Sequence, residues 1–186
     1  MPEESAAVVD GNEQNLDSKV YFRIEALSFA IMSATAGRVV TGTAVGVVGW
    51  TLTEYVAHRW AMHGRRAHRS LAAREHRLHH AEPERTEAAL RALAYAGIGV
   101  ASVAISGAAG AVTGRRIAAR SAAVAWFGGY TAYEMLHHRA HHKPVRWRLE
   151  EPLRERHFDH HLGNPGRNFG VTTPLWDRVF GTQARR

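Results

Sequence analysis

The chain has 186 residues, no cysteine, a formal net charge of +7 and a pI of about 10.5. The absence of cysteine excludes disulfides, iron–sulfur clusters, thiolate-ligated haem and zinc sites that use Cys. The length suits one domain or a small multi-pass membrane protein, and the basic charge suits nucleic acid, anionic lipid headgroups or acidic substrates.

The N-terminal segment, residues 1–19, is polar and acidic and shows no hydrophobic periodicity. This composition predicts a disordered tail. No basic stretch leads directly into an apolar core, so a cleavable signal peptide is not expected. Residues 20–186 are expected to form one membrane-embedded domain.

The first apolar stretch covers residues 26–53 and is interrupted only by Arg38, which follows Gly37. Each half is shorter than the roughly 20 residues of a perpendicular membrane-spanning helix. The sequence leaves open a short hairpin and one long helix with Arg38 facing the bundle interior. Gly42 and Gly46, four residues apart, fit close helix packing.

The clearest transmembrane candidate is the uncharged stretch 92–114, and residues 117–136 form a second candidate. Within the first, Gly110 and Gly114 again have the spacing of close helix packing. Buried helices of a soluble bundle are the alternative, but the uncharged length favours a membrane. An out-and-back hairpin would leave the flanking arginine-rich segments on one side, which the positive-inside tendency assigns to the cytoplasm.

All thirteen histidines lie between His58 and His161, and most fall into four groups that read HRWAMH, HRLHH, HHRAHH and HFDHH. Helix positions three and four apart share a face. We therefore expect the three imidazoles of each His-x-x-His-His unit to converge on one point. Ten residues are candidate metal ligands: His58, His63, His76, His79, His80, His137, His141, His157, His160 and His161.

Ten imidazoles are too many for one ion, because zinc takes four ligands and iron up to about six. They fit two metals that share a site, with each His-x-x-His-His unit supplying one side. Neutral imidazole suits zinc, iron, copper or nickel, and open positions on iron permit dioxygen chemistry. His58 and His63, five apart, suit the end of a helix. Surface placement is the preferred interpretation for the lone His68. It is also preferred for His138 and His142, although they share the four-residue spacing of His137 and His141, because the family resemblance described below selects His137 and His141.

Five sequence stretches between residues 50 and 182 resemble the fatty acid hydroxylase superfamily, which includes sterol desaturases, sterol methyl oxidases and carotenoid hydroxylases. They are EYVAHRWAMH, EHRLHH, YEMLHHRAHH, HFDHH and NFGVTTPLWDRVFGT. The last stretch most resembles the fatty acid and sterol branches, and HRWAMHG resembles carotenoid hydroxylases. The resemblance implies an all-α integral membrane helical bundle with a cytoplasmic histidine-rich cap that holds a dimetal site.

The resemblance also implies a function and its partners. It predicts a membrane-bound di-iron oxygenase that uses dioxygen and an external reductant to hydroxylate a C–H bond of a fatty acyl or sterol-like lipid. The same ten histidines would bind two iron ions, and zinc can replace iron in the isolated protein. In the third group the family pattern maps onto His137, His141 and His142. No catalytic residue beyond the ligands is expected.

The expected partners are a lipophilic substrate from the bilayer, membrane lipids and an electron donor such as a ferredoxin, cytochrome or reductase. A nucleic-acid role is not expected, because no binding module is visible. Two alternatives stay open: carotenoid hydroxylation or lipid desaturation at the same site, and a non-catalytic membrane metal-binding protein.

Side chains around the ligands are expected to support the site. Carboxylates that accept imidazole N–H groups orient metal ligands, and the candidates for this role are Glu54, Glu134, Asp159 and Asp177. Aromatic side chains are candidates to line the substrate path, although packing or interfacial anchoring is the preferred interpretation for each one taken singly. They are Trp50, Trp60, Trp126, Tyr130 and Tyr133.

Overall fold

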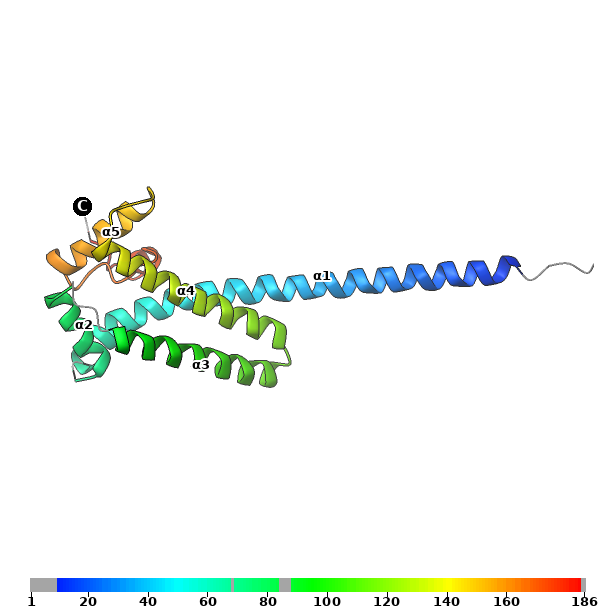
Figure 1. Cartoon of the computed structure of the whole chain (residues 1–186), viewed down its shortest axis with the longest axis horizontal. Helices are drawn as coiled ribbons and strands as arrows, with labels where there is room; N and C mark the ends of the chain where they lie inside the picture. Colours follow the sequence, from blue (N-terminus) through cyan, green and yellow to red (C-terminus); the bar gives the residue numbers. More distant parts are fainter. Residues whose placement is uncertain (1–9, 68, 84–87, 185–186) are drawn as a thin grey trace, which may run out of the picture.

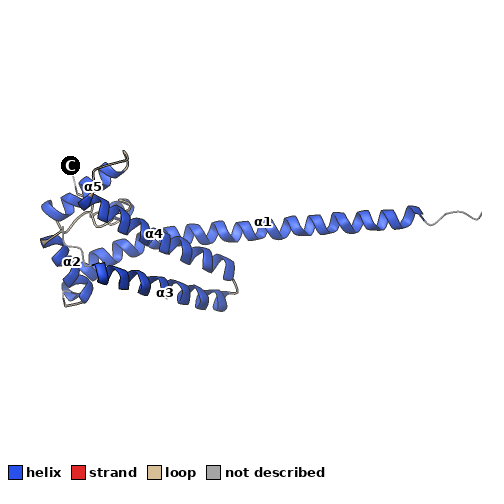
Figure 2. Ribbon diagram, viewed as in Figure 1, coloured by secondary structure: helices blue, strands red, loops and turns tan. Residues whose placement is uncertain are grey.

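The computed structural model describes residues 10–67, 69–83 and 88–184, which Figures 1 and 2 show as helices joined by loops. No strand occurs in these ranges, which confirms the all-α prediction. The elements in chain order are α1 (Asp10–Val56), the π-helix η1 (Ala57–Met62), the 3₁₀-helix η2 (Arg65–Ala67), α2 (Leu71–Ala81), α3 (Ala88–Thr113), α4 (Arg116–His142), α5 (Glu150–Phe158), the π-helix η3 (Asp159–Gly163) and α6 (Leu175–Val179).

The first helix, α1, is continuous over 47 residues. Of the two alternatives for this stretch, the single long helix is therefore correct and the short hairpin is wrong. Figure 1 shows its C-terminal part beside the α3–α4 hairpin and its N-terminal part projecting alone. Arg38 is exposed, so the expectation that it faces the bundle interior is wrong. It lies one turn before Gly42, which packs against Ala118 near the beginning of α4.

The start of α1 also differs from the predicted tail at 1–19. Residues 10–19 are helical, and residues 1–9 lie outside the described part. Extending an existing helix by one residue costs little compared with nucleating it, and Glu13, Gln14 and Leu16 are good helix formers. The domain boundary at residue 20 stays a prediction.

Close packing joins α1 to α4 at two glycines. A Cβ atom at Gly42 would collide with the carbonyl oxygen of Ala118, and one at Gly46 would collide with that of Ala122. Only glycine permits this approach, so the first predicted glycine pair is confirmed as a packing site. The second pair differs, because Gly114 forms the turn between α3 and α4 with a φ of 68°.

Two helical segments are long and apolar enough to cross a membrane: Lys19–Met62 and Arg91–Thr113. Their most apolar windows are only 11% and 6% buried inside the protein, unlike the core helices of a soluble bundle. The stretch 117–136 in α4, predicted as a further crossing, does not reach the same hydropathy among the described residues. It packs against both α1 and α3, which lets α4 carry polar groups such as Glu134.

The shorter elements gather into a cap at one end of the long helices (Figure 1). The C-terminal segment folds back onto the end of α1. The Trp176 indole N–H donates to Thr51 Oγ1 at 3.0 Å, and the hydroxyls of Tyr55 and Thr182 lie 2.9 Å apart. The Tyr55 ring is fully buried and stacks on Phe180. The cap therefore depends on contacts between residues that lie more than 100 positions apart in the sequence.

Candidate metal centre

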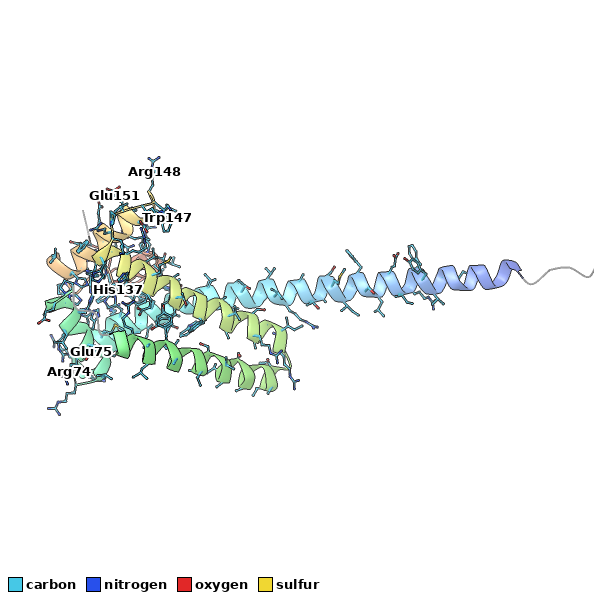
Figure 3. The ribbon with its side chains drawn as sticks, in the orientation of Figure 1. Arg74, Glu75, His137, Trp147, Arg148 and Glu151 are labelled. Atoms are coloured by element: carbon cyan, nitrogen blue, oxygen red, sulfur yellow. The ribbon has the colours of Figure 1, made fainter. Side chains whose placement is uncertain are left out.

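The ten histidines singled out by their spacing lie together in the cap and form two groups of five. Within each group, one nitrogen of every imidazole lies within 4.8 Å of the others, a geometry that can hold a metal ion. We call His58, His63, His76, His80 and His160 the first group, and His79, His137, His141, His157 and His161 the second group. Figure 3 shows His137 inside this crowded end of the molecule.

Each His-x-x-His-His unit is divided between the two groups, so the expectation that its three imidazoles converge on one point is wrong. His76 and His80 belong to the first group, whereas His79 belongs to the second. Positions three and four further along a helix lie about 100° apart around its axis, because each residue turns the helix by that angle. Adjacent histidines therefore point to different sides of the helix, and each unit contributes to both groups.

The two π-helices bring further ligands into position. In η1 the backbone N–H of His63 donates to the carbonyl of His58 at 3.2 Å, the five-residue bond of a π-helix. The wider turn lets residues five apart share a face, and both histidines join the first group. A second π-helix, η3, carries His160 and His161 and closes with a bond from Asn164 N to Asp159 O at 2.8 Å.

Distances between imidazole nitrogens match those around a shared metal ion. The Nε2 atom of His76 lies 2.8 Å from that of His63 and 3.0 Å from that of His80. In the second group, His79 and His137 approach Nε2 to Nε2 at 2.8 Å. Nitrogen ligands about 2.1 Å from a metal and about 90° apart lie about 3.0 Å from one another. The donor sets therefore fit metal ions.

The protonation state of these imidazoles also suits metal binding. Burial lowers the pKa of His79 to about 3, and it lowers the pKa of His80 and His160 to about 4. Repulsion from neighbouring imidazoles acts in the same direction. These side chains are therefore neutral at pH 7, and only the neutral form of imidazole binds a metal.

One buried imidazole nitrogen of the second group lacks a hydrogen-bond partner among the described residues, which points to a bound ligand at this position. His161 Nε2 is buried and has no hydrogen-bond partner in the described part of the protein. An unsatisfied buried polar atom costs about 1–3 kcal/mol. A metal ion within the second group would satisfy this atom. The His161 ring also stacks on His80 with centroids 4.0 Å apart, so the two groups are in contact.

Backbone carbonyls hold the outer nitrogens of two histidines in the first group. His58 Nδ1 lies 2.5 Å from the carbonyl oxygen of Phe169, and His160 Nδ1 lies 2.7 Å from that of Arg167. Asn168 stands between them with a φ of 55°, a conformation that asparagine tolerates better than most residues. Sequence reasoning missed both carbonyls, because any residue supplies one; the available signal was the Asn-Phe-Gly turn.

The four carboxylates predicted to accept imidazole N–H groups bind arginines, backbone N–H groups or an amide in place of imidazoles. Asp177 is fully buried and accepts from the backbone N–H of Phe169 at 2.9 Å and of Gly170 at 2.8 Å. It also pairs with Arg156 at 3.2 Å. Asp177 therefore acts on the imidazole of His58 indirectly, by fixing the loop whose carbonyl holds it.

The other three carboxylates are structural as well. Glu54 accepts from the backbone N–H of Thr172 at 2.9 Å and holds the same loop on α1. Asp159 accepts from the Asn168 amide at 2.6 Å. Glu134, the favoured candidate, pairs with Arg91 across α3 and α4 at 2.9 Å, one turn away from His137.

His138 and His142 belong to neither group, although the His142 ring centroid lies 6.2 Å from that of His141. His138 and His142 face each other with ring centroids 4.6 Å apart. The resemblance-based mapping of His142 therefore finds no place in either group. His68 lies outside the described residues.

A cavity of about 730 Å³ opens between α1, α2, α3 and α4 and reaches both histidine groups. Its wall is largely apolar and includes Ile98, Trp126, Tyr130 and Tyr133, and Trp50 also contributes. Four of the five predicted aromatic residues therefore line it. Trp60 instead lies outside, half exposed beside Arg59. The cavity can bring an apolar molecule to the imidazoles.

Comparison with known proteins agrees with this arrangement. The family model described as fatty acid hydroxylase matches residues 43–182. A dihydroceramide fatty acyl 2-hydroxylase of Arabidopsis thaliana is 28% identical over 170 residues, which cover 81% of this chain and 64% of the relative. A ceramide very long chain fatty acid hydroxylase of Schizosaccharomyces pombe is 36% identical over 55 residues, 30% of this chain and 16% of the relative.

A solved structure of full-length scs7p, in which only the hydroxylase domain is visible, has the same fold. It aligns with a TM-score of 0.56 at 21% identity and covers 84% of this chain and 65% of that chain. The chain thus spans a little under two thirds of the length of the plant relative and of this structure.

Proposed function

Because the chain belongs to the fatty acid hydroxylase family, we propose that it is a membrane-bound oxygenase that hydroxylates a C–H bond of a fatty acyl or sterol-like lipid. The observation that carries the proposal is the pair of five-histidine groups at the end of a largely apolar cavity. A site for metal chemistry and a space for an apolar molecule meet there.

The ten grouped histidines are the proposed ligands of two iron ions, five for each ion. Five imidazoles leave a position free on a six-coordinate metal, and zinc can take the place of iron in isolated protein. Bound iron would supply dioxygen activation and transfer of one oxygen atom to carbon, with electrons from an external donor such as a ferredoxin, cytochrome or reductase.

The protein's own contribution is to orient the ligands and exclude water. The carbonyls of Phe169 and Arg167 fix the rings of His58 and His160, so that Nε2 of each ring faces the first group. Asp177 fixes the loop that carries these carbonyls. Outer partners of this kind typically change metal affinity or activity about 10–100-fold.

The substrate would enter the cavity between the helices from the bilayer. Its chain would lie against Trp126, Tyr130 and Ile98, with the reacting carbon next to the imidazoles of His79 and His137. The comparisons support acyl hydroxylation over carotenoid hydroxylation or desaturation, since the similar proteins bear names of fatty acyl hydroxylases. The cavity itself favours an enzyme over a non-catalytic metal-binding protein.

Membrane insertion would place the α3–α4 hairpin and the C-terminal part of α1 in lipid, with the cap on the cytoplasmic side. The exposure of the apolar windows in α1 and α3 supports insertion. The arginines around the cap support the orientation.

The proposal is tested by a metal count on the full chain, purified in detergent under anaerobic conditions with iron supplied. We expect about two ions per chain. We also expect that supplying reductant and oxygen adds one oxygen atom to a lipid in an extract, detected by mass spectrometry. A control variant, His138→Ala, should keep its metal because this side chain lies outside both groups. A chain without bound metal, or a loaded chain that oxidises no lipid, would refute the proposal.

A further inference from the structure

The loop between α4 and α5 combines positive charge with exposed apolar side chains. Residues 143–149 read KPVRWRL, with three cations and no acidic residue, and all seven are exposed. The exposed fractions of Val145, Trp147 and Leu149 are 41%, 48% and 80%. We call residues 143–149 the basic loop. Its composition differs from that of an ordinary solvated turn, which lacks large apolar groups.

Contacts with the neighbouring helices hold the basic loop in a defined shape. Glu150, at the start of α5, accepts from the backbone N–H of Arg146 at 2.7 Å and of Trp147 at 3.3 Å. The same carboxylate pairs with Arg139 of α4. The guanidinium of Arg139 lies 5.0 Å from the Trp147 ring centroid. The Glu150 carboxylate is thus already paired with Arg139, and the three cations of the loop are exposed.

The depth of Trp147, measured along the axis of α4, would fall in the headgroup layer of a bilayer that covers the uncharged stretch of α3. The Arg91–Glu134 pair joins α3 and α4 where the uncharged stretch of α3 begins. Arg139, which lies over Trp147, is five residues further along α4, a rise of about 7.5 Å. The headgroup layer on each side of a bilayer is about 5–8 Å thick.

The direction of the basic loop agrees with that depth. Figure 1 shows the segment between α4 and α5 projecting sideways from the bundle, not over the end of the cap. Figure 3 shows Trp147 and Arg148 at this outer edge, with Trp147 on the side of the long helices. Tryptophan is enriched at membrane interfaces, and clustered Lys and Arg side chains favour anionic lipids.

We propose that the basic loop is an interfacial anchor, which inserts Trp147 and Leu149 among lipid headgroups and binds anionic lipids through Lys143, Arg146 and Arg148. The anchor would fix the tilt of α5, which carries His157 of the second group. An acidic redox protein is the other partner that three cations suit. The exposed Leu149 and the headgroup depth of Trp147 favour the bilayer.

The test uses the absence of cysteine in the chain, which allows a single label at any position. An environment-sensitive fluorophore is attached to Leu149→Cys in the full chain, reconstituted in vesicles of phosphatidylcholine with or without phosphatidylglycerol. The matched control is Glu151→Cys, two residues further on and also exposed. We expect a blue-shifted emission at position 149 and quenching by headgroup-level spin-labelled lipid at least about threefold stronger than at position 151.

Charge is tested separately with Arg146→Gln and Arg148→Gln combined in the Leu149→Cys background. The increase in quenching caused by phosphatidylglycerol should fall to less than about half, because two of the three cations are removed. Emission typical of water at position 149 in both vesicle types would overturn the proposal. So would a blue shift that requires an added acidic redox protein. The readout does not depend on hydroxylase activity, so its failure is distinct from failure of the proposed function.

Discussion

The two histidine groups contain equal numbers of imidazoles but are held by different parts of the chain. In the first group, the Nδ1 atoms of His58 and His160 lie at hydrogen-bond distance from backbone carbonyls of the C-terminal loop. In the second group, the ligands stand on helices α2, α4 and α5 and on η3, and the outer nitrogen of His157 has no partner among the described residues. The first group therefore depends on a loop distant in sequence, whereas the second depends on helix packing.

The largest expected effect comes from Asp177→Ala, which should break the first group selectively. The change removes the acceptor of two backbone N–H groups and a carboxylate partner of Arg156. Loss of one member of a buried charge pair costs about 3–5 kcal/mol. Thermal unfolding and metal count should show a less stable protein that loses metal first from this group. Glu151→Ala, on the surface, serves as control, and equal loss from both groups would contradict the comparison.

Single ligand changes should sharpen the distinction. His63→Ala removes a ligand from the first group and His141→Ala removes one from the second. Each variant is expected to fall from about two ions per chain toward about one, because the affected group keeps four of its five imidazoles and binds a six-coordinate ion less tightly. Metal analysis combined with absorption spectra would distinguish the two variants. Complete loss of metal in either one would mean that the groups form a single unit.

A change in helix packing should disturb the spacing between the groups without touching a ligand. Gly46→Val places side-chain atoms against the Ala122 carbonyl and forces α1 away from α4. Overpacking of this kind costs about 1–3 kcal/mol. The control is Gly37→Val, where a Cβ meets nothing within 4 Å. Unfolding midpoints in detergent should differ between the two variants, and equal midpoints would show that the close approach is unimportant.

The stability of the metal-free protein should also depend on pH. The pKa of His79 falls to about 3 and that of His80 to about 4 on folding, against an ordinary value near 6.5. The unfolded chain then binds more protons than the folded chain between pH 6.5 and about 4. Stability should fall as pH decreases through this window and stay level above it. A midpoint of unfolding that rises between pH 7.5 and 5.5 would contradict the burial of these imidazoles.

The sequence was sufficient to identify all ten grouped histidines only with the help of the resemblance, because spacing alone does not distinguish His137 and His141 from His138 and His142. It was not sufficient to divide them, since the assignment of His79 and His80 to different groups depends on where α4 and α5 pack. The supporting contacts were harder still. Carbonyls of Phe169 and Arg167 have no signature in residue type, and the carboxylates of Glu134 and Asp177 satisfy arginines or backbone N–H groups.

The fold, like the site, was predictable in part from the sequence. The resemblance predicted an all-α bundle, and the glycines at 42 and 46 predicted close packing within it. The choice between a hairpin and one helix in α1 was open, because Gly37 weakens a helix without ending it and Arg38 interrupts the apolar run. The turn at Gly114 was mistaken for a packing site, since the same residue type serves both purposes.

The length of α1 raises a question of hydrophobic mismatch. Its 47 residues extend for about 70 Å, and the apolar stretch 26–53 alone extends for about 42 Å, against roughly 30 Å of hydrocarbon in a bilayer. Residues from Gly42 onward are fixed against α4, whereas Phe22, Phe29 and Met32 are exposed beyond the hairpin. If α1 is inserted as proposed, this mismatch would favour tilting or bending of the helix. Gly37, which weakens a helix and has open space around it, is the position where bending would cost least.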